Sequence, residues 1–265
     1  MTTVYPPAPY GLKLKLSRAR KHLRHLRRIV GRYEASNPWA LRCQENADGS
    51  YYLYSLEFVD APTNILLLAD EAIHHLRSVL DHLVCASVAS IGKKIESQSF
   101  PIRTEEPKGK SIAIYDACLR DVPDPVRALV DSVQPYHRGD GAKSHPLAIL
   151  ARLDNGFKHT SLHLMTNQVR MPAVPGIIQH PARERSHDSG DIFAEVPTSV
   201  NVEKDFEPFI SVEVAFRIRE ARLPQINLDT LDGIYDFIRD EILRKLVRWD
   251  HPPRRMRTLS HGAPP

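Results

Sequence analysis

The sequence has few cysteines and no long hydrophobic run, and both absences restrict what the protein can be. The cysteines number three, an odd count, and no two have C-x-x-C spacing, so neither a disulfide framework nor a cysteine-based zinc site is indicated. No apolar run approaches the roughly 18 residues that span a bilayer, and the N-terminus has no charged start followed by an apolar stretch. We therefore expect a soluble cytoplasmic protein without a secretory signal or a membrane partner.

Several common catalytic and nucleotide-binding motifs are also absent. The sequence contains no Walker P-loop, no G-x-G-x-x-G, no H-E-x-x-H and no G-x-S-x-G. Each of these patterns supplies a particular chemistry: phosphate binding, dinucleotide binding, zinc ligation or an activated serine. Their absence argues against the corresponding enzyme classes, and no cofactor is expected.

Positive charge is concentrated in one part of the chain. Nine basic residues and no acidic ones lie between Lys13 and Arg32, and a second basic cluster lies at residues 254–257. Such a distribution favours an anionic partner, nucleic acid first; the alternative is a solvated helix face and a solubilising tail. The candidate nucleic-acid ligands in the first cluster are Arg20, Arg24 and Arg27.

Hydrophobic residues recur at helical spacing over much of the chain. The clearest stripe runs from Leu12 to Tyr33 at alternating intervals of four and three residues, the pattern of a helix that packs on another helix. Similar spacing, with prolines and capping residues at the expected ends, predicts the other helices. The helical segments are expected at about 12–36, 62–91, 123–159 and 228–250.

Two other parts of the chain show the alternation typical of strands. Residues 39–58 predict a hairpin, because Asp48-Gly49 is a two-residue turn signal between alternating segments. Residues 161–218 contain further short strands, with a long loop expected at 172–190. Both parts predict β structure appended to the helices.

Together these elements predict the fold class and the domain organisation. Helical segments dominate, and no internal repeat divides the chain. We expect a single α+β domain over residues 1–265, in which a bundle of four to five helices carries a small antiparallel β-sheet. Residues 93–121 show no uniform pattern, and a disordered tail is expected at 251–265.

The helix expected at 62–91 carries an unusual set of polar residues. On a wheel of about 100° per residue, its polar side chains, His75 and Ser78 included, fall within about 120°. Arg77 lies at the border, one turn before Asp81, where the two can pair. Histidines and carboxylates exchange protons near neutral pH, so this face is a candidate active site, with a solvated surface as the alternative. The candidate catalytic residues are Arg77, His82, His74, Asp81 and Glu71.

A second polar cluster lies where the helix before residue 160 is expected to end. It consists of Asp154, Asn155, Lys158 and His159. Lys158 and His159 are candidate nucleic-acid ligands; the alternative is that cations here only complement the helix dipole.

Residues Arg77 to His82 match the R-x4-H form of the HEPN motif. The wider stretch 71–83 resembles a group of uncharacterised bacterial and phage proteins, which share counterparts of 100–102, 134–136 and 153–159. HEPN domains are helical bundles, and many are metal-independent ribonucleases of toxin–antitoxin and defence systems. The resemblance therefore implies a ribonuclease acting on RNA, typically as a homodimer.

Cleavage of RNA without metal needs a base, an acid and a cation for the phosphorane charge. In the first hypothesis His82 is the base or acid, and Arg77 holds the phosphate with two parallel hydrogen bonds. Five residues turn a helix by about 140°, so the two side chains do not project side by side. A two-fold interface could instead bring one chain's arginine near the other chain's histidine.

Two other hypotheses remain open. The second is a non-catalytic helical module that binds nucleic acid or a nucleotide through the basic first helix. The third is a metal site, for which Glu71 and His74 have the i,i+3 spacing of di-iron bundles. Since a second Glu-x-x-His is missing, this hypothesis ranks last and no metal is expected. Its candidate ligands are Glu71, His74, Asp81, His82 and His159.

Overall fold

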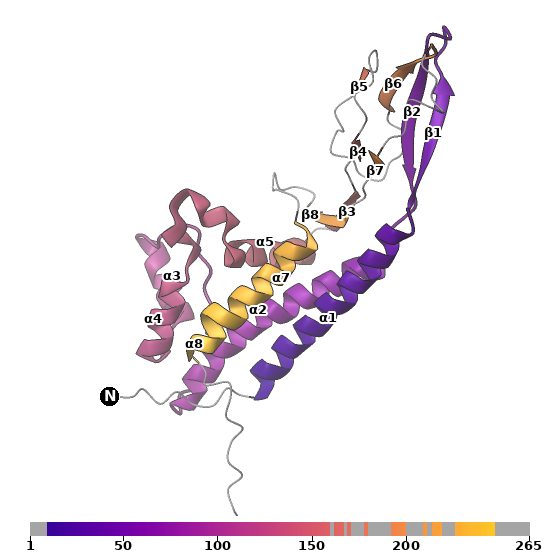
Figure 1. Cartoon of the computed structure of the whole chain (residues 1–265). Helices are drawn as coiled ribbons and strands as arrows, with labels where there is room; N and C mark the ends of the chain where they lie inside the picture. The colour runs from indigo at the N-terminus through magenta and orange to yellow at the C-terminus, as the bar shows by residue number, and fades with distance from the viewer. Residues whose placement is uncertain are drawn as a thin grey trace, which may run out of the picture.

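The two longest helices, α1 (Tyr10–Ala35) and α2 (Asn64–Ser90), lie side by side along most of their length (Figure 1). The computed structural model describes residues 10–159, 162–166, 169–170, 178–179, 192–199, 209–210, 214–218 and 226–246. Within these residues, no helix combines the length and the apolar character needed to cross a membrane. The predicted stripe of α1 is buried throughout: Leu12, Leu16, Ala19, Leu23, Leu26, Val30 and Tyr33.

The last helix lies against α1 and α5 and completes the main core. It begins at α7 (Leu228–Phe237), continues through a π-helical turn (Ile238–Leu243) and ends in α8 (Arg244–Leu246). Asn227 caps its first turn, because its Oδ1 accepts the backbone N–H of Thr230 at 3.0 Å. The π-helical turn was not predicted, because over one turn the sequence pattern of buried apolar residues is the same for an α-helix and a π-helix. The expected end near residue 250 lies outside the described residues.

Shorter helices form the side of the bundle that faces α2 and α7 (Figure 1). They are α3 (Lys110–Cys118), α4 (Asp124–Ser132), a 3-10 helix (Pro135–Ser144) and α5 (Pro146–His159). The sequence predicted α4 and α5 but not α3, whose single buried residue, Tyr115, leaves no stripe to detect. The helical range expected at 123–159 is interrupted by the 3-10 turns, which kink at Gly139, where φ is +53°.

The principal sheet extends away from the helices and contains four antiparallel strands in the order β1-β2-β6-β5 (Figure 1). The predicted hairpin is confirmed: Trp39 pairs with Phe58 at its base, and Glu45 pairs with Tyr52 near its tip. Gly49 occupies the turn with φ +74°, a conformation that glycine adopts without strain. The strands are β1 (Trp39–Glu45), β2 (Tyr51–Phe58), β5 (Ile178–Gln179) and β6 (Ile192–Pro197).

Two smaller ladders lie between the principal sheet and the helices (Figure 1). Strand β3 (Leu162–Thr166) pairs with β8 (Val214–Ile218), and β4 (Val169–Arg170) pairs with β7 (Phe209–Ile210). β5 falls inside the segment predicted as a long loop, since two residues are too few to show alternation. The architecture is therefore α+β, a helical bundle with an appended antiparallel sheet, as predicted. The expected tail and its basic cluster lie outside the described residues.

Candidate functional site

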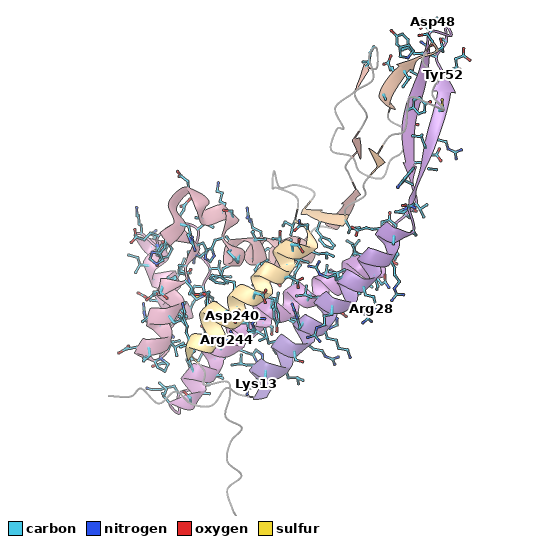
Figure 2. The ribbon with its side chains drawn as sticks, in the orientation of Figure 1. Lys13, Arg28, Asp48, Tyr52, Asp240 and Arg244 are labelled. Carbon is cyan, nitrogen blue, oxygen red and sulfur yellow. The ribbon has the colours of Figure 1, made fainter. Side chains whose placement is uncertain are left out.

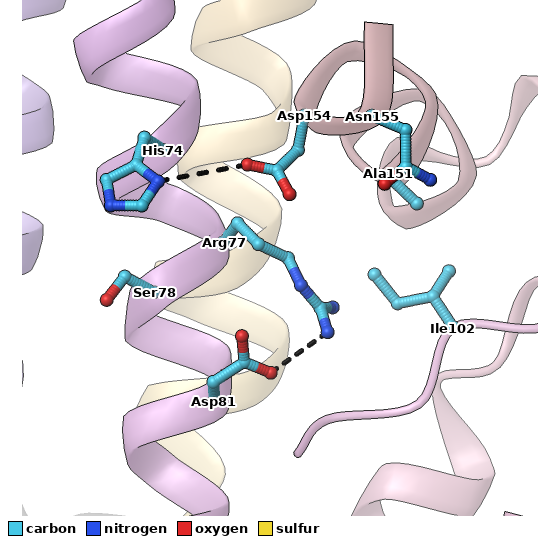
Figure 3. Close-up of a pocket in the computed structure, with 8 residues that line it drawn as sticks. All are labelled: His74, Arg77, Ser78, Asp81, Ile102, Ala151, Asp154 and Asn155. Carbon is cyan, nitrogen blue, oxygen red and sulfur yellow. Dashed lines mark hydrogen bonds and ion pairs between the residues drawn. The ribbon is translucent and has the colours of Figure 1, made fainter. Parts of the chain in front are cut away.

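A polar cavity of about 370 Å³ opens between α2, α5 and the segment around Ile102 (Figure 3). Helix α2 supplies its charged wall, and α5 supplies an acid and an amide. Three of the five candidate catalytic residues, His74, Arg77 and Asp81, line it together. The full lining is His74, Arg77, Ser78, Asp81, Ile102, Ala151, Asp154 and Asn155.

Arg77 and Asp81 form the predicted i,i+4 ion pair, and both also bind the segment that passes over α2. Nη2 of Arg77 donates to Oδ1 of Asp81 at 2.9 Å and to the carbonyl of Phe100 at 2.8 Å. The same Oδ1 accepts the backbone N–H of Phe100 at 2.9 Å. Because Phe100 is fully buried, water cannot bond its backbone N–H and C=O, and this ion pair supplies their hydrogen-bond partners. A structural role for Arg77 and Asp81 is therefore established beside any catalytic one.

Gln134 fixes the next residues of the same segment. Its Nε2 donates to the carbonyl of Pro101 at 2.8 Å, and its Oε1 accepts the backbone N–H of Arg103 at 3.0 Å. Gln134 is itself buried, and its bond to Pro101 forms away from water, whereas its bond to Arg103 is only partly buried. The side chains of Arg77, Asp81 and Gln134 thus fix the backbone of residues 100–103, which form the cavity wall around Ile102.

His74 and Asp154 face each other across the cavity (Figure 3). Nδ1 of His74 lies 4.0 Å from Oδ1 of Asp154. The imidazole is 64% exposed, whereas the carboxylate side chain is only 7% exposed. Nearby, burial raises the pKa of Asp70, and Asp154 and Glu71 raise it further. The arrangement places an accessible imidazole beside a buried carboxylate.

Three polar residues of α2 lie toward α1, namely Glu71, Ser78 and His82, and Ser78 also borders the cavity. Nδ1 of His22 lies 3.0 Å from Oε2 of Glu71, and Nζ of Lys15 donates to Oγ of Ser78 at 2.7 Å. Burial lowers the pKa of His82, and Lys15 lowers it further. The predicted single polar face is thus divided between two neighbours, and neither Glu71 nor His82 lines the cavity that contains Arg77.

His75 occupies the interface between α1 and α2. Its ring stacks on that of His22, with centroids 5.4 Å apart and planes 19° from parallel. Its Nδ1 is buried and has no hydrogen-bond partner in the described part of the chain. Burial lowers the pKa of His75, as do the nearby His22, Lys15, His74 and Arg18. The folded protein therefore favours neutral His75.

Folding stability should decrease as the pH falls from 7 toward about 5, where unfolded histidine gains its proton. The unfolded chain protonates His75 near the ordinary pKa of 6.5, whereas the folded chain resists protonation. The stabilisation is thus complete above pH 6.5 and is lost below it. His82 and His145, whose pKa values burial also lowers, act in the same direction.

The thermal midpoint of His75→Phe, followed by circular dichroism against pH, should show a flatter decline than the wild type. Phenylalanine preserves a ring against His22 but cannot gain a proton. The matched control is His25→Phe, because His25 is exposed on α1. Equal pH profiles for wild type and His75→Phe would contradict this assignment.

A second hollow, of about 530 Å³, lies along α1 and reaches Leu68 of α2. Its cations recur at intervals of three and four residues, so they share one helix face. Figure 2 shows Arg28 on the side of α1 that points away from the other helices. The lining is Arg18, Lys21, His22, Arg24, His25, Arg28 and Leu68. We call this surface the α1 groove.

Two of the three arginines predicted as nucleic-acid ligands bind α7 rather than the α1 groove. Nη1 of Arg20 lies 3.2 Å from Oδ1 of Asp232, and its guanidinium stacks over Tyr235 at 4.9 Å. Nη2 of Arg27 lies 2.8 Å from Oδ1 of Asp229 and also pairs with Asp232. Arg24 alone of the three lines the groove. The three-and-four spacing of Arg18, Lys21, His25 and Arg28 was the sequence feature that could have identified the groove residues.

Two further predictions concern Lys158 with His159 and a metal site. The side chains of Lys158 and His159 lie outside the described residues. In the part of the chain that is described, no group of three or more His, Cys, Asp and Glu side chains is placed to hold a metal ion. The five metal-ligand candidates do not form such a group there.

Comparison of the chain with family models, curated proteins and solved structures finds no match. The resemblance to HEPN domains therefore stays a prediction. Function has to be inferred from the α2–α5 cavity and the α1 groove themselves.

Proposed function

We propose that the protein binds RNA through the α1 groove. The observation that carries the proposal is the set of cations that line it: Arg18, Lys21, Arg24 and Arg28. None of these four has an ion-pair partner among the described residues, whereas Arg20 and Arg27 are neutralised by α7. Unpaired cations aligned on one helix face attract a phosphate backbone and release its counterions on binding.

The groove also offers groups that can contact bases. The exposed His25 lies among the cations, and imidazole and guanidinium planes stack on unpaired bases. The four cations span eleven residues, or about 15 Å of helix, which suits a short single-stranded segment. RNA is proposed rather than DNA because the R-x4-H stretch of α2 resembles HEPN ribonucleases.

Binding of labelled single-stranded RNA should weaken steeply with salt. If four phosphates are contacted, the logarithm of affinity should fall with the logarithm of salt with a slope of about −3. The double variant Arg24→Glu/Arg28→Glu should bind much more weakly and lose about 1.4 of this slope. Filter binding or fluorescence anisotropy at several salt concentrations measures both quantities.

The matched control is Lys94→Glu/Lys108→Glu, which changes the net charge equally at exposed positions outside α1. It should keep the wild-type slope. Loss of affinity in both double variants would show that net charge, not the groove, drives binding. Absence of wild-type binding at low salt would refute the proposal.

A second candidate function, RNA cleavage, is favoured by one observation: His74 and Arg77 line the same cavity. In this proposal His74 removes the proton of a 2′-hydroxyl and returns it to the 5′-oxygen. The 2′-oxygen bonds to phosphorus, the bond from phosphorus to the 5′-oxygen breaks, and a 2′,3′-cyclic phosphate results. Arg77 stabilises the phosphorane charge, and Asp154 lies 4.0 Å from the imidazole of His74.

The R-x4-H hypothesis uses His82 instead of His74. Within one chain His82 lies on the α1 side of α2, so Arg77 would have to act with His82 of a second copy. The two versions of the ribonuclease proposal therefore differ in one residue, His74 or His82. Substitution of each histidine distinguishes them.

A further inference from the structure

Strand β1 forms one edge of the principal sheet. Among the described strands it pairs only with β2, and its other side is unpaired. Figure 1 shows β1 on the outer side of the sheet, which extends away from the helices. Figure 2 places Asp48, at the tip of this hairpin, far from the helical bundle. An incoming strand could therefore reach this edge without contacting the bundle.

The hydrogen bonds at the two ends of the hairpin show which backbone groups are free. The N–H of Asn46 donates to the carbonyl of Tyr51, and the N–H of Val59 donates to the carbonyl of Pro38, both at 2.9 Å. Hydrogen-bonded pairs alternate along an antiparallel ladder, so the even-numbered residues of β1 bond to β2. The odd-numbered residues point their N–H and C=O groups outward: Trp39, Leu41, Cys43 and Glu45.

The N–H of Trp39 is already used, because it donates to the carbonyl of Asn37 at 2.7 Å. The free edge therefore consists of Leu41, Cys43 and Glu45. Proteins usually protect such an edge with proline, lysine or a β-bulge. β1 contains no proline and no lysine, and its register with β2 is regular.

The same odd-numbered residues lie on the apolar face of the sheet. Cys43 pairs with Tyr54, which pairs in turn with Ala194. Tyr54 and Ala194 are buried, whereas Leu41 and Cys43 are exposed. The opposite face carries an ion pair, with Arg42 bound to Glu57 at 2.7 Å. The apolar face thus continues to the edge strand and is exposed there.

We propose that β1 pairs antiparallel with β1 of a second copy of this chain, with Cys43 opposite Cys43 of the second copy. In this register Leu41 lies opposite Glu45 of the second copy, and every free edge residue is used. Three bonded pairs, each exchanging two hydrogen bonds, give about six bonds. A shift of one residue in each strand toward the bundle would need the N–H of Trp39 and would place Arg42 opposite Arg42.

The self-complementary edge favours a second copy over an unrelated peptide. Two identical strands satisfy one another in this register without opposing like charges. The joined sheets also extend the apolar face across both copies. The inference concerns a different surface from the α1 groove and does not rest on RNA binding or cleavage.

Sedimentation velocity of the full chain should show a dimer, and a mild two-electron oxidant should cross-link it. Each thiol at Cys43 would lose a proton and an electron to form one disulfide. Directly opposed bonded residues have Cα atoms about 5.5 Å apart, within the range that a disulfide spans. Cys43→Ser should remove the cross-link but keep the dimer, and Cys85→Ser and Cys118→Ser should keep both.

A charge pair at Leu41 tests the register. Leu41→Glu places a glutamate opposite Glu45 of the second copy and should raise the dissociation constant about tenfold. Leu41→Lys places an attractive pair there and should leave the dimer at least as stable. A monomeric wild type would overturn the proposal. So would equal dissociation constants for these two variants, or a cross-link that survives Cys43→Ser.

Discussion

Leu76→Ala should lower the free energy of unfolding by about 2–5 kcal/mol. Leu76 has no exposed surface and lies in the stripe that α2 presents to the rest of the core. Truncation removes apolar contact and leaves a cavity that the long paired helices cannot easily close. Urea denaturation should show a lower midpoint with an unchanged slope, because the native fold persists.

The matched control is Leu67→Ala on the same helix. Leu67 is 64% exposed, so its truncation should change the free energy of unfolding by no more than about 0.5 kcal/mol. The pair isolates burial from helix propensity, since both variants exchange leucine for alanine within α2. Similar losses at the two positions would show that the buried and exposed faces of α2 are wrongly assigned.

His74→Ala should lower RNA cleavage by a factor of about 10² to 10⁴, the usual contribution of a general base. His74 is the exposed imidazole of the α2–α5 cavity, and it faces the buried Asp154. Chelators should not affect the reaction, because the proposed steps use side chains alone. A labelled RNA substrate should yield 2′,3′-cyclic phosphate ends, which gel mobility before and after acid treatment can identify.

The choice of control variants separates the alternatives. His137→Ala changes an exposed histidine outside both the cavity and the α1 groove and should cleave like wild type. If His82→Ala abolishes cleavage while His74→Ala does not, the R-x4-H version with a second copy replaces the cavity version. If the wild type leaves diverse RNAs intact, the ribonuclease proposal is wrong, and RNA binding by the α1 groove stands on its own test.

Arg77 needs a stability measurement beside any activity assay. Its guanidinium binds Asp81 and the carbonyl of Phe100, so Arg77→Ala loosens one wall of the cavity as well as removing a cation. A loss of activity with an unchanged thermal midpoint would support a role in phosphate binding. A parallel loss of both would assign Arg77 to structure alone.

Much of the fold follows from short-range patterns. The stripe from Leu12 to Tyr33 fixes α1, because helical spacing places every third or fourth residue on one face. Asp48-Gly49 fixes the hairpin through the backbone conformation of its turn. Asn227 marks the start of α7 because its side chain can accept a free N–H of the first turn. Helix α3 could not be predicted in this way, because it buries only Tyr115 and has no apolar stripe.

The candidate site depends on contacts that no local pattern contains. The sequence predicted the pairing of Arg77 with Asp81, which are one helical turn apart. It could not show that Glu71 and His82 lie outside the cavity, because their surroundings are set by how α1 packs on α2. Asp154 joins His74 only because α5 folds back onto α2.

The same distinction applies to the basic helix. The sequence by itself determined that α1 carries a strong positive charge and, through the spacing of its apolar residues, a buried apolar stripe. Only the tertiary structure decided which cations remain available: Arg27 is neutralised by Asp232, 205 residues away in the sequence. The physical reason is that periodicity and turn chemistry act between neighbours in the chain, whereas ion pairs and cavities form between elements that folding brings together.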